Sequence, residues 1–218
     1  MGRKCEFCKM RILVIAATKL EIETFMADSK GVEILITGVG VPATIYSLQK
    51  KLQQNSTDVV IQAGIAGSFE NDIGLGEVIL VKQDTFADIG MEENDKFTDI
   101  FQAGFADKNV FPFHDGWLVN PNAIFTHSLL RAVKAITINK VSDSELQKQQ
   151  AITNFAPQIE SMEGAASHYV CLQENTPFIQ LRSISNYVGE RDKSRWKMKE
   201  AIANLNIELR NLIERWSD

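Results

Sequence analysis

Three side chains that could do chemistry stand where apolar runs of the sequence end. Glu21 follows the run at residues 11–16, Glu163 stands at the start of an expected helix, and Asn186 follows the run at residues 177–185. A carboxylate can act as a base near neutral pH, whereas an amide donates and accepts hydrogen bonds but cannot give up a proton. The sequence therefore raises the question of why an amide occupies position 186, where a carboxylate would be the more usual acid.

The elements that position these residues alternate between strand and helix. Apolar runs predict strands at residues 11–16, 32–37, 58–64, 76–84, 135–139 and 177–185. Helix-compatible stretches lie at 19–28, 42–54, 143–154 and 161–175, followed by a long C-terminal helix. Near-continuous apolar strands between helices predict an α/β sandwich with a mainly parallel sheet. Ligands of such sheets bind beyond the carboxyl ends of the strands, where Glu21, Glu163 and Asn186 are expected.

Two further stretches have plainer patterns. Residues 85–121 are rich in Phe, Asp and Gly without periodicity, so we expect loops there, including one that covers a site. The C-terminal helix has an apolar stripe that we interpret as packing on the core, formed by Met198, Ile202, Leu205, Leu209, Leu212 and Trp216.

Composition narrows the class of protein. The 218 residues are 44% hydrophobic and 23% charged with a formal net charge of −5, which suits one globular domain over residues 10–218. That charge gives no basic field for nucleic acid, and no apolar run is long enough to span a membrane. With three cysteines and no signal-peptide pattern, a cytoplasmic protein is expected.

No metal site or cofactor is predicted. Cys5 and Cys8 have the spacing of half a zinc site, but no second pair follows, so we favour a disordered leader at residues 1–9 over a metal or redox site. His114, His127 and His168 are scattered without metal-ligand spacing, and we interpret them as structural or surface residues.

Three stretches read together resemble the nucleoside phosphorylase and nucleosidase superfamily. They are ILVIAATKLEIETF, VVIQAGIAGSFENDIGLGEVILV and IESMEGAASHYVCLQENTPFIQLRSISNYV. Within it, the Met-Glu-Gly-Ala-Ala and Ile-Ser-Asn-Tyr-Val segments most resemble futalosine hydrolases, which are similar to methylthioadenosine/adenosylhomocysteine nucleosidases. The resemblance implies a three-layer αβα sandwich with a mixed, mainly parallel sheet, and a homodimer or larger homo-oligomer. It also implies hydrolysis of futalosine to hypoxanthine and dehypoxanthine futalosine in menaquinone biosynthesis.

The resemblance assigns roles to the two glutamates. Glu21 would hold and activate the attacking water, although the Thr18-to-Glu21 spacing also fits a capping box that ties off a helix. Glu163 would accept hydrogen bonds from the ribose hydroxyls while Met162 packs against the sugar. The alternative for Glu163 is an acidic residue placed to suit a helix dipole.

The nucleophile is expected to be water rather than phosphate. Phosphorylases of the superfamily carry an arginine two residues before the Gly-x-x-Gly loop, where this chain has Gln62, and an amide cannot replace the charge of that arginine. The loop is expected to be the backbone floor of the site, with Gly64, Ala66, Gly67 and Ser68 against the substrate. The glycines also fit a tight strand-to-helix turn.

Asn186 is interpreted as the residue that selects the purine. Adenine-specific nucleosidases place an aspartate here, whereas an amide can donate to a 6-oxo group and accept from N7–H. A mismatched base would leave a buried partner unpaired, at a cost of about 1–3 kcal/mol. The asparagine would thus favour hypoxanthine, unless it stands there only because it tolerates a strained turn. The sequence does not identify the group that protonates the base.

Other residues have weaker assignments. Arg191 and Arg195, with Tyr187 and Trp196, could meet the carboxylate that futalosine carries on its 5′ side, or they could form a solvated loop. Phe86 and Asp88 could line the same site. Rival functions are an adenine-releasing nucleosidase acting on methylthioadenosine, adenosylhomocysteine or aminodeoxyfutalosine, a phosphorylase, and a nucleoside-binding module without catalysis.

Overall fold

Helices and strands alternate at both ends of the chain, whereas the described residues between 59 and 137 contain six strands and no helix. The structure, a computed structural model, describes residues 10–29, 31–122, 129–141, 144–190 and 192–217. Its elements are β1 (Ile12–Ala16), α1 (Lys19–Met26), β2 (Glu33–Ile36), α2 (Val41–Gln54), β3 (Val59–Ser68), β4 (Val78–Asp84), β5 (Gly90–Glu93), β6 (Lys96–Asp99), β7 (Leu118–Val119), β8 (Ala132–Thr137), α3 (Glu145–Phe155), β9 (Ile159–Ser161), α4 (Gly164–Gln173), β10 (Phe178–Tyr187), the 3-10 turn η2 (Lys193–Arg195) and α5 (Met198–Ser217).

The main sheet closes partly on itself. Strand β3 pairs with β10, β10 with β4, β4 with β8, β8 with β9, and β9 again with β3, so these five strands form a ring. Strands β1 and β2 extend the sheet outward from the first half of β3. Five of the eight pairings described in this sheet are parallel, which confirms the expected mixed and mainly parallel α/β architecture.

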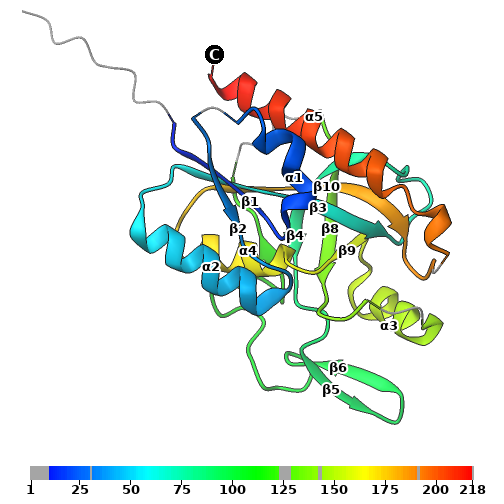
Figure 1. The fold of residues 1–218 in the computed structure, drawn as a ribbon. Coiled ribbons are helices and arrows are strands. Elements are labelled where there is room, and N and C mark those ends of the chain that lie inside the picture. The colour runs from blue at the N-terminus through cyan, green and yellow to red at the C-terminus, as the bar shows by residue number, and fades with distance from the viewer. Residues whose placement is uncertain (1–9, 30, 123–128, 142–143, 191, 218) are drawn as a thin grey trace, which may run out of the picture.

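Two helical layers cover the open part of the sheet (Figure 1). Alternate residues of a strand point to opposite faces, so Ile12 and Val14 pack with Leu205 and Leu209 of α5, on the face that also carries α1. The intervening residues of β1 pack with α2 and α4 in a second cluster that contains Leu13, Ile15, Leu48, Val170 and Phe178. Strand β1 is therefore buried on both sides, as its unbroken apolar sequence predicts.

The topology leaves a gap along one edge of β3. Strand β1 pairs with this edge as far as Gln62, and β9 joins it only at Gly67. Residues 63–66 lie between the two neighbours, so backbone groups here are available to side chains. A crevice where neighbouring strands diverge is the usual ligand site of an open α/β sheet.

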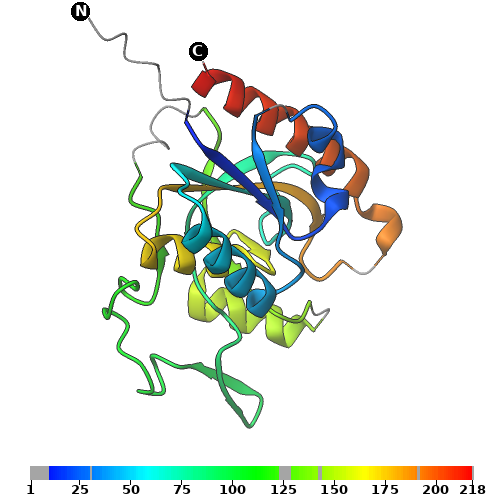
Figure 2. The same cartoon turned by 60° about the vertical axis from the view of Figure 1, so that its left-hand side comes forward.

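Several predicted boundaries were wrong. Residues 85–121 contain a hairpin, β5–β6, which projects from the body of the molecule, and the short strand β7 (Figure 2). Strand β9 precedes α4, where a helix was predicted from residue 161. Gly64 to Ser68 lie inside β3 rather than in a strand-to-helix turn, and Asn186 lies inside β10 rather than after it. The expected leader, with Cys5 and Cys8, lies outside the described residues.

The described part of the chain contains no helix with the length and apolarity to cross a membrane. Residue groups able to hold a metal ion were also not found among the described residues.

Candidate active site

A cavity of about 320 Å³, here called the central cavity, opens at the gap in β3. Its wall combines residues of the β1–α1 connection, the second half of β3, the start of α4, the end of β10 and the start of α5. The lining residues are Ala17, Thr18, Leu20, Glu21, Val39, Ile65, Ala66, Gly67, Ile138, Val141, Glu160, Ser161, Met162, Glu163, Ser185, Asn186, Trp196, Met198 and Ile202. Three carboxyl groups (Glu21, Glu160 and Glu163) and one amide (Asn186) therefore face a space whose other walls are mostly small or apolar side chains.

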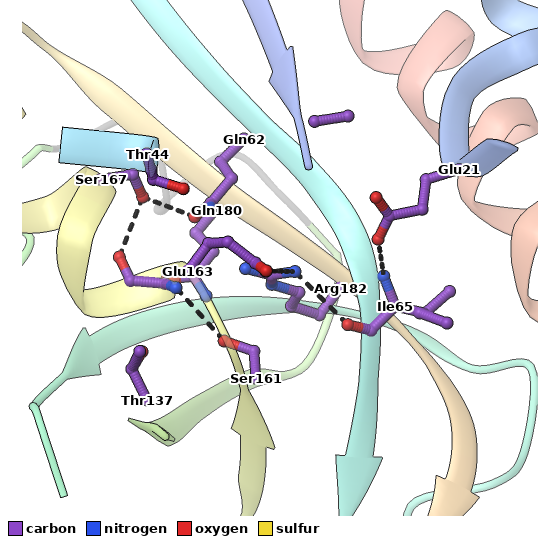
Figure 3. Close-up of polar contacts among 12 residues, drawn as sticks. Glu21, Thr44, Gln62, Ile65, Thr137, Ser161, Glu163, Ser167, Gln180 and Arg182 are labelled. Atoms are coloured by element: carbon purple, nitrogen blue, oxygen red, sulfur yellow. Dashed lines mark hydrogen bonds and ion pairs between the residues drawn. The ribbon is translucent and has the colours of Figure 1, made fainter. Parts of the chain in front are cut away.

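Glu21 links the start of α1 to the gap in β3. Its Oε2 accepts hydrogen bonds from the Thr18 backbone N–H (3.0 Å) and hydroxyl (3.1 Å), as the capping-box spacing predicts. Its Oε1 accepts from the backbone N–H of Ile65 at 3.2 Å, across the gap (Figure 3). Only 8% of Glu21 is exposed. The carboxylate of Glu21 thus both caps α1 and faces the central cavity. Its remaining lone pairs can hold a water at the cavity wall.

Glu163 stands opposite, as the N-cap residue of α4. Its Oε1 accepts a hydrogen bond from the backbone N–H of Gly40 at 3.1 Å, and Gly40 has a φ of 86°, a conformation that glycine adopts without strain. Its Oε2 lies 3.7 Å from Nη1 of Arg182, which is 1% exposed. Burial raises the pKa of Glu163, against the opposing effects of Arg182 and the Gly40 N–H.

Arg182 was missed by the sequence analysis. Besides facing Glu163, its Nη1 donates to the backbone carbonyl of Ile65 at 3.3 Å, so it joins β10, β3 and the start of α4 beneath the cavity (Figure 3). A charged residue inside the apolar run FIQLRSIS was the available signal, because a buried guanidinium requires a partner of opposite charge.

Asn186 occupies the other end of the cavity, at a register shift between β10 and β3. Its Oδ1 accepts from the Ser185 hydroxyl at 2.8 Å and its Nδ2 donates to the carbonyl of Tyr187 at 3.1 Å. The Tyr187 carbonyl can only accept, so it fixes which end of the amide is NH₂. One N–H and one lone pair of the amide remain for a ligand.

Comparison with known proteins bears on this arrangement. A family model described as the phosphorylase superfamily matches residues 13–215. The chain belongs to the phosphorylase superfamily. Futalosine hydrolases of Thermus thermophilus and Streptomyces coelicolor are each 27% identical to it, aligned over 84% and 85% of this chain and 81% of each relative. The fold matches the 5′-methylthioadenosine/S-adenosylhomocysteine nucleosidase of Helicobacter pylori with a TM-score of 0.78 at 15% identity, over 95% of this chain and 99% of that one.

In this phosphorylase-superfamily chain the glycine-rich stretch forms part of the cavity wall. Ala66 and Gly67 line the central cavity, while Gly64 and Ser68 do not. Ser68 is buried, and its hydroxyl contacts the carbonyls of Glu70 and Gln158. A Cβ on Gly64 would lie 2.3 Å from Arg182 Nη1 and 3.0 Å from Glu21 Oε1. Gly64 therefore provides room for the two side chains that organise the gap.

Replacing Gly64 by alanine is expected to damage both the site and the fold. The added methyl would push Arg182 from Glu163 and Ile65, and such overpacking costs about 1–3 kcal/mol. We expect a lower melting temperature and at least a tenfold lower kcat/KM, measured with a purine nucleoside substrate. Gly74→Ala is the matched control, because its nearest neighbour would lie at 3.7 Å. An active and stable Gly64→Ala variant would contradict this account.

Part of the C-terminal apolar stripe belongs to the cavity rather than to the core. Leu205, Leu209 and Leu212 pack in the core as predicted, but Met198 and Ile202 line the central cavity together with Trp196. Periodicity cannot separate these cases, because a cavity wall and a core both require apolar side chains. Met162 also lines the cavity.

The remaining candidates lie elsewhere. Phe86 is not among the lining residues and places its ring 6.3 Å from that of Tyr169. Asp88 accepts a hydrogen bond from the Asn139 side chain at 3.2 Å and lines a neighbouring cavity. Arg195 is exposed and pairs with Glu190 at 3.0 Å, and the Tyr187 hydroxyl donates to the carbonyl of Ile73. Arg191 lies outside the described residues.

Gln62 and His168 are buried in the layer behind the cavity. The Gln62 side chain accepts a hydrogen bond from the Ser167 hydroxyl and is not among the cavity-lining residues (Figure 3). His168 lies 3.0 Å from the carbonyl of Leu118 through Nδ1, and burial lowers its pKa to about 4. Both side chains contribute to internal packing in this structure. His114 is exposed, and His127 lies outside the described residues.

Proposed function

We propose that this protein hydrolyses the N-ribosidic bond of futalosine and releases hypoxanthine. The observation that carries the proposal is the amide of Asn186 in the cavity wall, with its orientation fixed by Ser185 and Tyr187. Its free N–H suits the 6-oxo group of hypoxanthine and is mismatched to the 6-amino group of adenine. The two futalosine hydrolases similar to this chain support the same substrate.

The positions of Glu21 and Glu163 give the two carboxylates different roles in the proposed reaction. Glycosidic cleavage passes through a state in which positive charge develops on the sugar, and nearby carboxylates stabilise it. Glu21, bound to Thr18 and Ile65, holds the attacking water and accepts its proton. Glu163, held by Gly40 and Arg182, accepts hydrogen bonds from the ribose hydroxyls while Met162 packs against the sugar.

Water is the proposed nucleophile because the cavity wall is acidic. Glu21, Glu160 and Glu163 line it, and Arg182, the one arginine that is buried among the described residues, contacts Glu163 and the Ile65 carbonyl through Nη1. Phosphate would be repelled by the carboxylates of Glu21 and Glu163. The proposed enzyme belongs to menaquinone biosynthesis, and its cytoplasmic location and homo-oligomeric state remain predictions from the sequence.

The test is base release in phosphate-free buffer. Purified protein incubated with futalosine should yield hypoxanthine, identified by chromatography, at a rate that added phosphate does not raise. A strict requirement for phosphate would instead identify a phosphorylase. Adenine release from methylthioadenosine with no hypoxanthine from futalosine would favour the adenine nucleosidase, the function named for the Helicobacter pylori structure that shares this fold.

A further inference from the structure

One carboxyl group of the central cavity has no role in the mechanism above. Glu160 lies on β9, directly opposite Gly67 of β3, and Asn186 of β10 faces the same glycine from the other side. A Cβ on Gly67 would lie 3.3 Å from Nδ2 of Asn186 and 3.5 Å from Cγ of Glu160. The amide and the carboxyl group are thus neighbours across a bare stretch of backbone, at the same end of the cavity.

Glu160 also stands where two cavities meet. It lines both the central cavity and a second one of about 300 Å³, here called the side cavity, which is enclosed by α3, the β5–β6 hairpin and the ends of β3 and β8. Structural packing does not account for a carboxyl group here, since an apolar residue between the two cavities would avoid the cost of burying a polar group.

Among the described residues, none is a partner for the carboxyl group of Glu160. Within the described residues its carboxyl group makes no hydrogen bond or ion pair, although several charged groups line the same walls: Asp88, Glu92, Lys140 and Lys148 in the side cavity, and Glu21 and Glu163 in the central one. Desolvation by burial raises the pKa of Glu160 to about 7. A carboxyl group in this state is protonated in a large fraction of molecules at neutral pH and can donate a hydrogen bond.

The proposed reaction lacks such a donor. When the C1′–N9 bond breaks, its electron pair moves into the purine, which leaves more readily if a proton is added to the ring. Asn186 cannot give up a proton, Glu21 must be ionised to accept one from water, and Glu163 is placed for the ribose. Glu160, beside Asn186, is the remaining acid among the described residues of the cavity wall.

We propose that Glu160 is the general acid that protonates the departing purine. The inference rests on the proposed function. The proton leaves the Glu160 carboxyl oxygen for N7 as the C1′–N9 electron pair enters the base, and Glu160 becomes a carboxylate. Water held at Glu21 forms the new bond to C1′ and gives its proton to Glu21. Asn186 binds O6 of the same base. Asn186 therefore selects the base and the adjacent Glu160 protonates it.

The first test is the pH dependence of Glu160→Gln, which keeps the size of the side chain. In the wild type, the acid is present below its pKa, so kcat for futalosine should fall as pH rises through about 7. The variant should have a kcat lower by about 10²–10⁴-fold below pH 7, with little change in KM, and should lack this fall. Glu92→Gln, an exposed residue of the side cavity, is the control and should behave as wild type.

The second test supplies the positive charge chemically. Methylation of futalosine at N7 gives a base that is already cationic, so its departure needs no acid. Glu160→Gln and Glu160→Ala should recover most of the wild-type rate on this substrate, after subtraction of the uncatalysed rate, because a merely structural defect would persist. The alanine variant also removes any clash with the added methyl group.

Three results would overturn the proposal: a wild-type kcat in Glu160→Gln, an equal loss on parent and N7-methylated substrates, or a change confined to KM and to the choice of base. Each variant is also assayed on methylthioadenosine, whose N7 is likewise an acceptor. If the wild type cleaves only that nucleoside, the proposed substrate is rejected while the comparison of variants still decides the role of Glu160. If the wild type cleaves neither, both proposals fail.

Discussion

Glu21→Gln is expected to lower kcat for base release by about a thousandfold, within the range that loss of a general base produces. The glutamine side chain cannot accept a proton from the attacking water. Its NH₂ group would also face either the Ile65 N–H or the Thr18 N–H, both of which donate to the native carboxylate. We therefore expect some loss of thermal stability together with the loss of turnover, measured by hypoxanthine release and by the melting temperature.

The control for this prediction lies two residues along the same helix. Glu23 is exposed, so Glu23→Gln changes the same functional group without touching the cavity. If Glu21→Gln still binds hypoxanthine, measured by titration calorimetry, the lost turnover belongs to the chemical step. A kcat above one tenth of the wild-type value would show that Glu21 is only a helix cap.

The elements that were predicted well are those whose own residues indicate a strand or a helix. Strand β1 is an unbroken apolar run, and α2 begins with Pro42 in its first turn, where its missing N–H costs nothing. The second half of β3 had no such signal, because glycine is rare in strands and its pairing with β10 is a tertiary contact. The three residues of β9 are likewise too few for any periodicity.

The β5–β6 hairpin could have been found. Asn94 and Asp95 connect its strands with φ values of 50° and 60°, a conformation that Asn and Asp tolerate and that tight hairpin turns require. The sequence EENDKF therefore contained a turn signal that the charged surroundings obscured.

The cavity was predictable only in part. Glu21, Glu163 and Asn186 were identified because the sequence predicted them to follow strands or begin a helix, and the closing of the sheet brings all three to one cavity. Glu160 and Arg182 had no such position. Each lies within a strand, and its importance depends on what the neighbouring strands leave open or covered, which only the three-dimensional pairing determines.

Asn186→Asp is expected to shift the preference of the enzyme from 6-oxopurine to 6-aminopurine nucleosides. One carboxyl oxygen accepts from a 6-amino group whether or not the other oxygen carries a proton, whereas the amide N–H that donates to a 6-oxo group is lost. A mismatch of about 1–3 kcal/mol on each base corresponds to a change of roughly 30-fold to 2 × 10⁴-fold in the ratio of kcat/KM values for methylthioadenosine and futalosine. An unchanged ratio, measured by competition between the two nucleosides, would remove the basis for the proposed substrate.

The same substitution also tests which residue supplies the proton. The Tyr187 carbonyl, which accepts from Nδ2 of Asn186, would lie beside the new carboxyl group and favour its protonated form. The introduced aspartic acid could then protonate the base itself, so Glu160→Gln should cost much less in the Asn186→Asp background than alone. A double-mutant cycle on methylthioadenosine measures this coupling. If Glu160→Gln lowers the rate by the same factor in both backgrounds, the two side chains do not replace each other as proton donor. Another group would then be the acid.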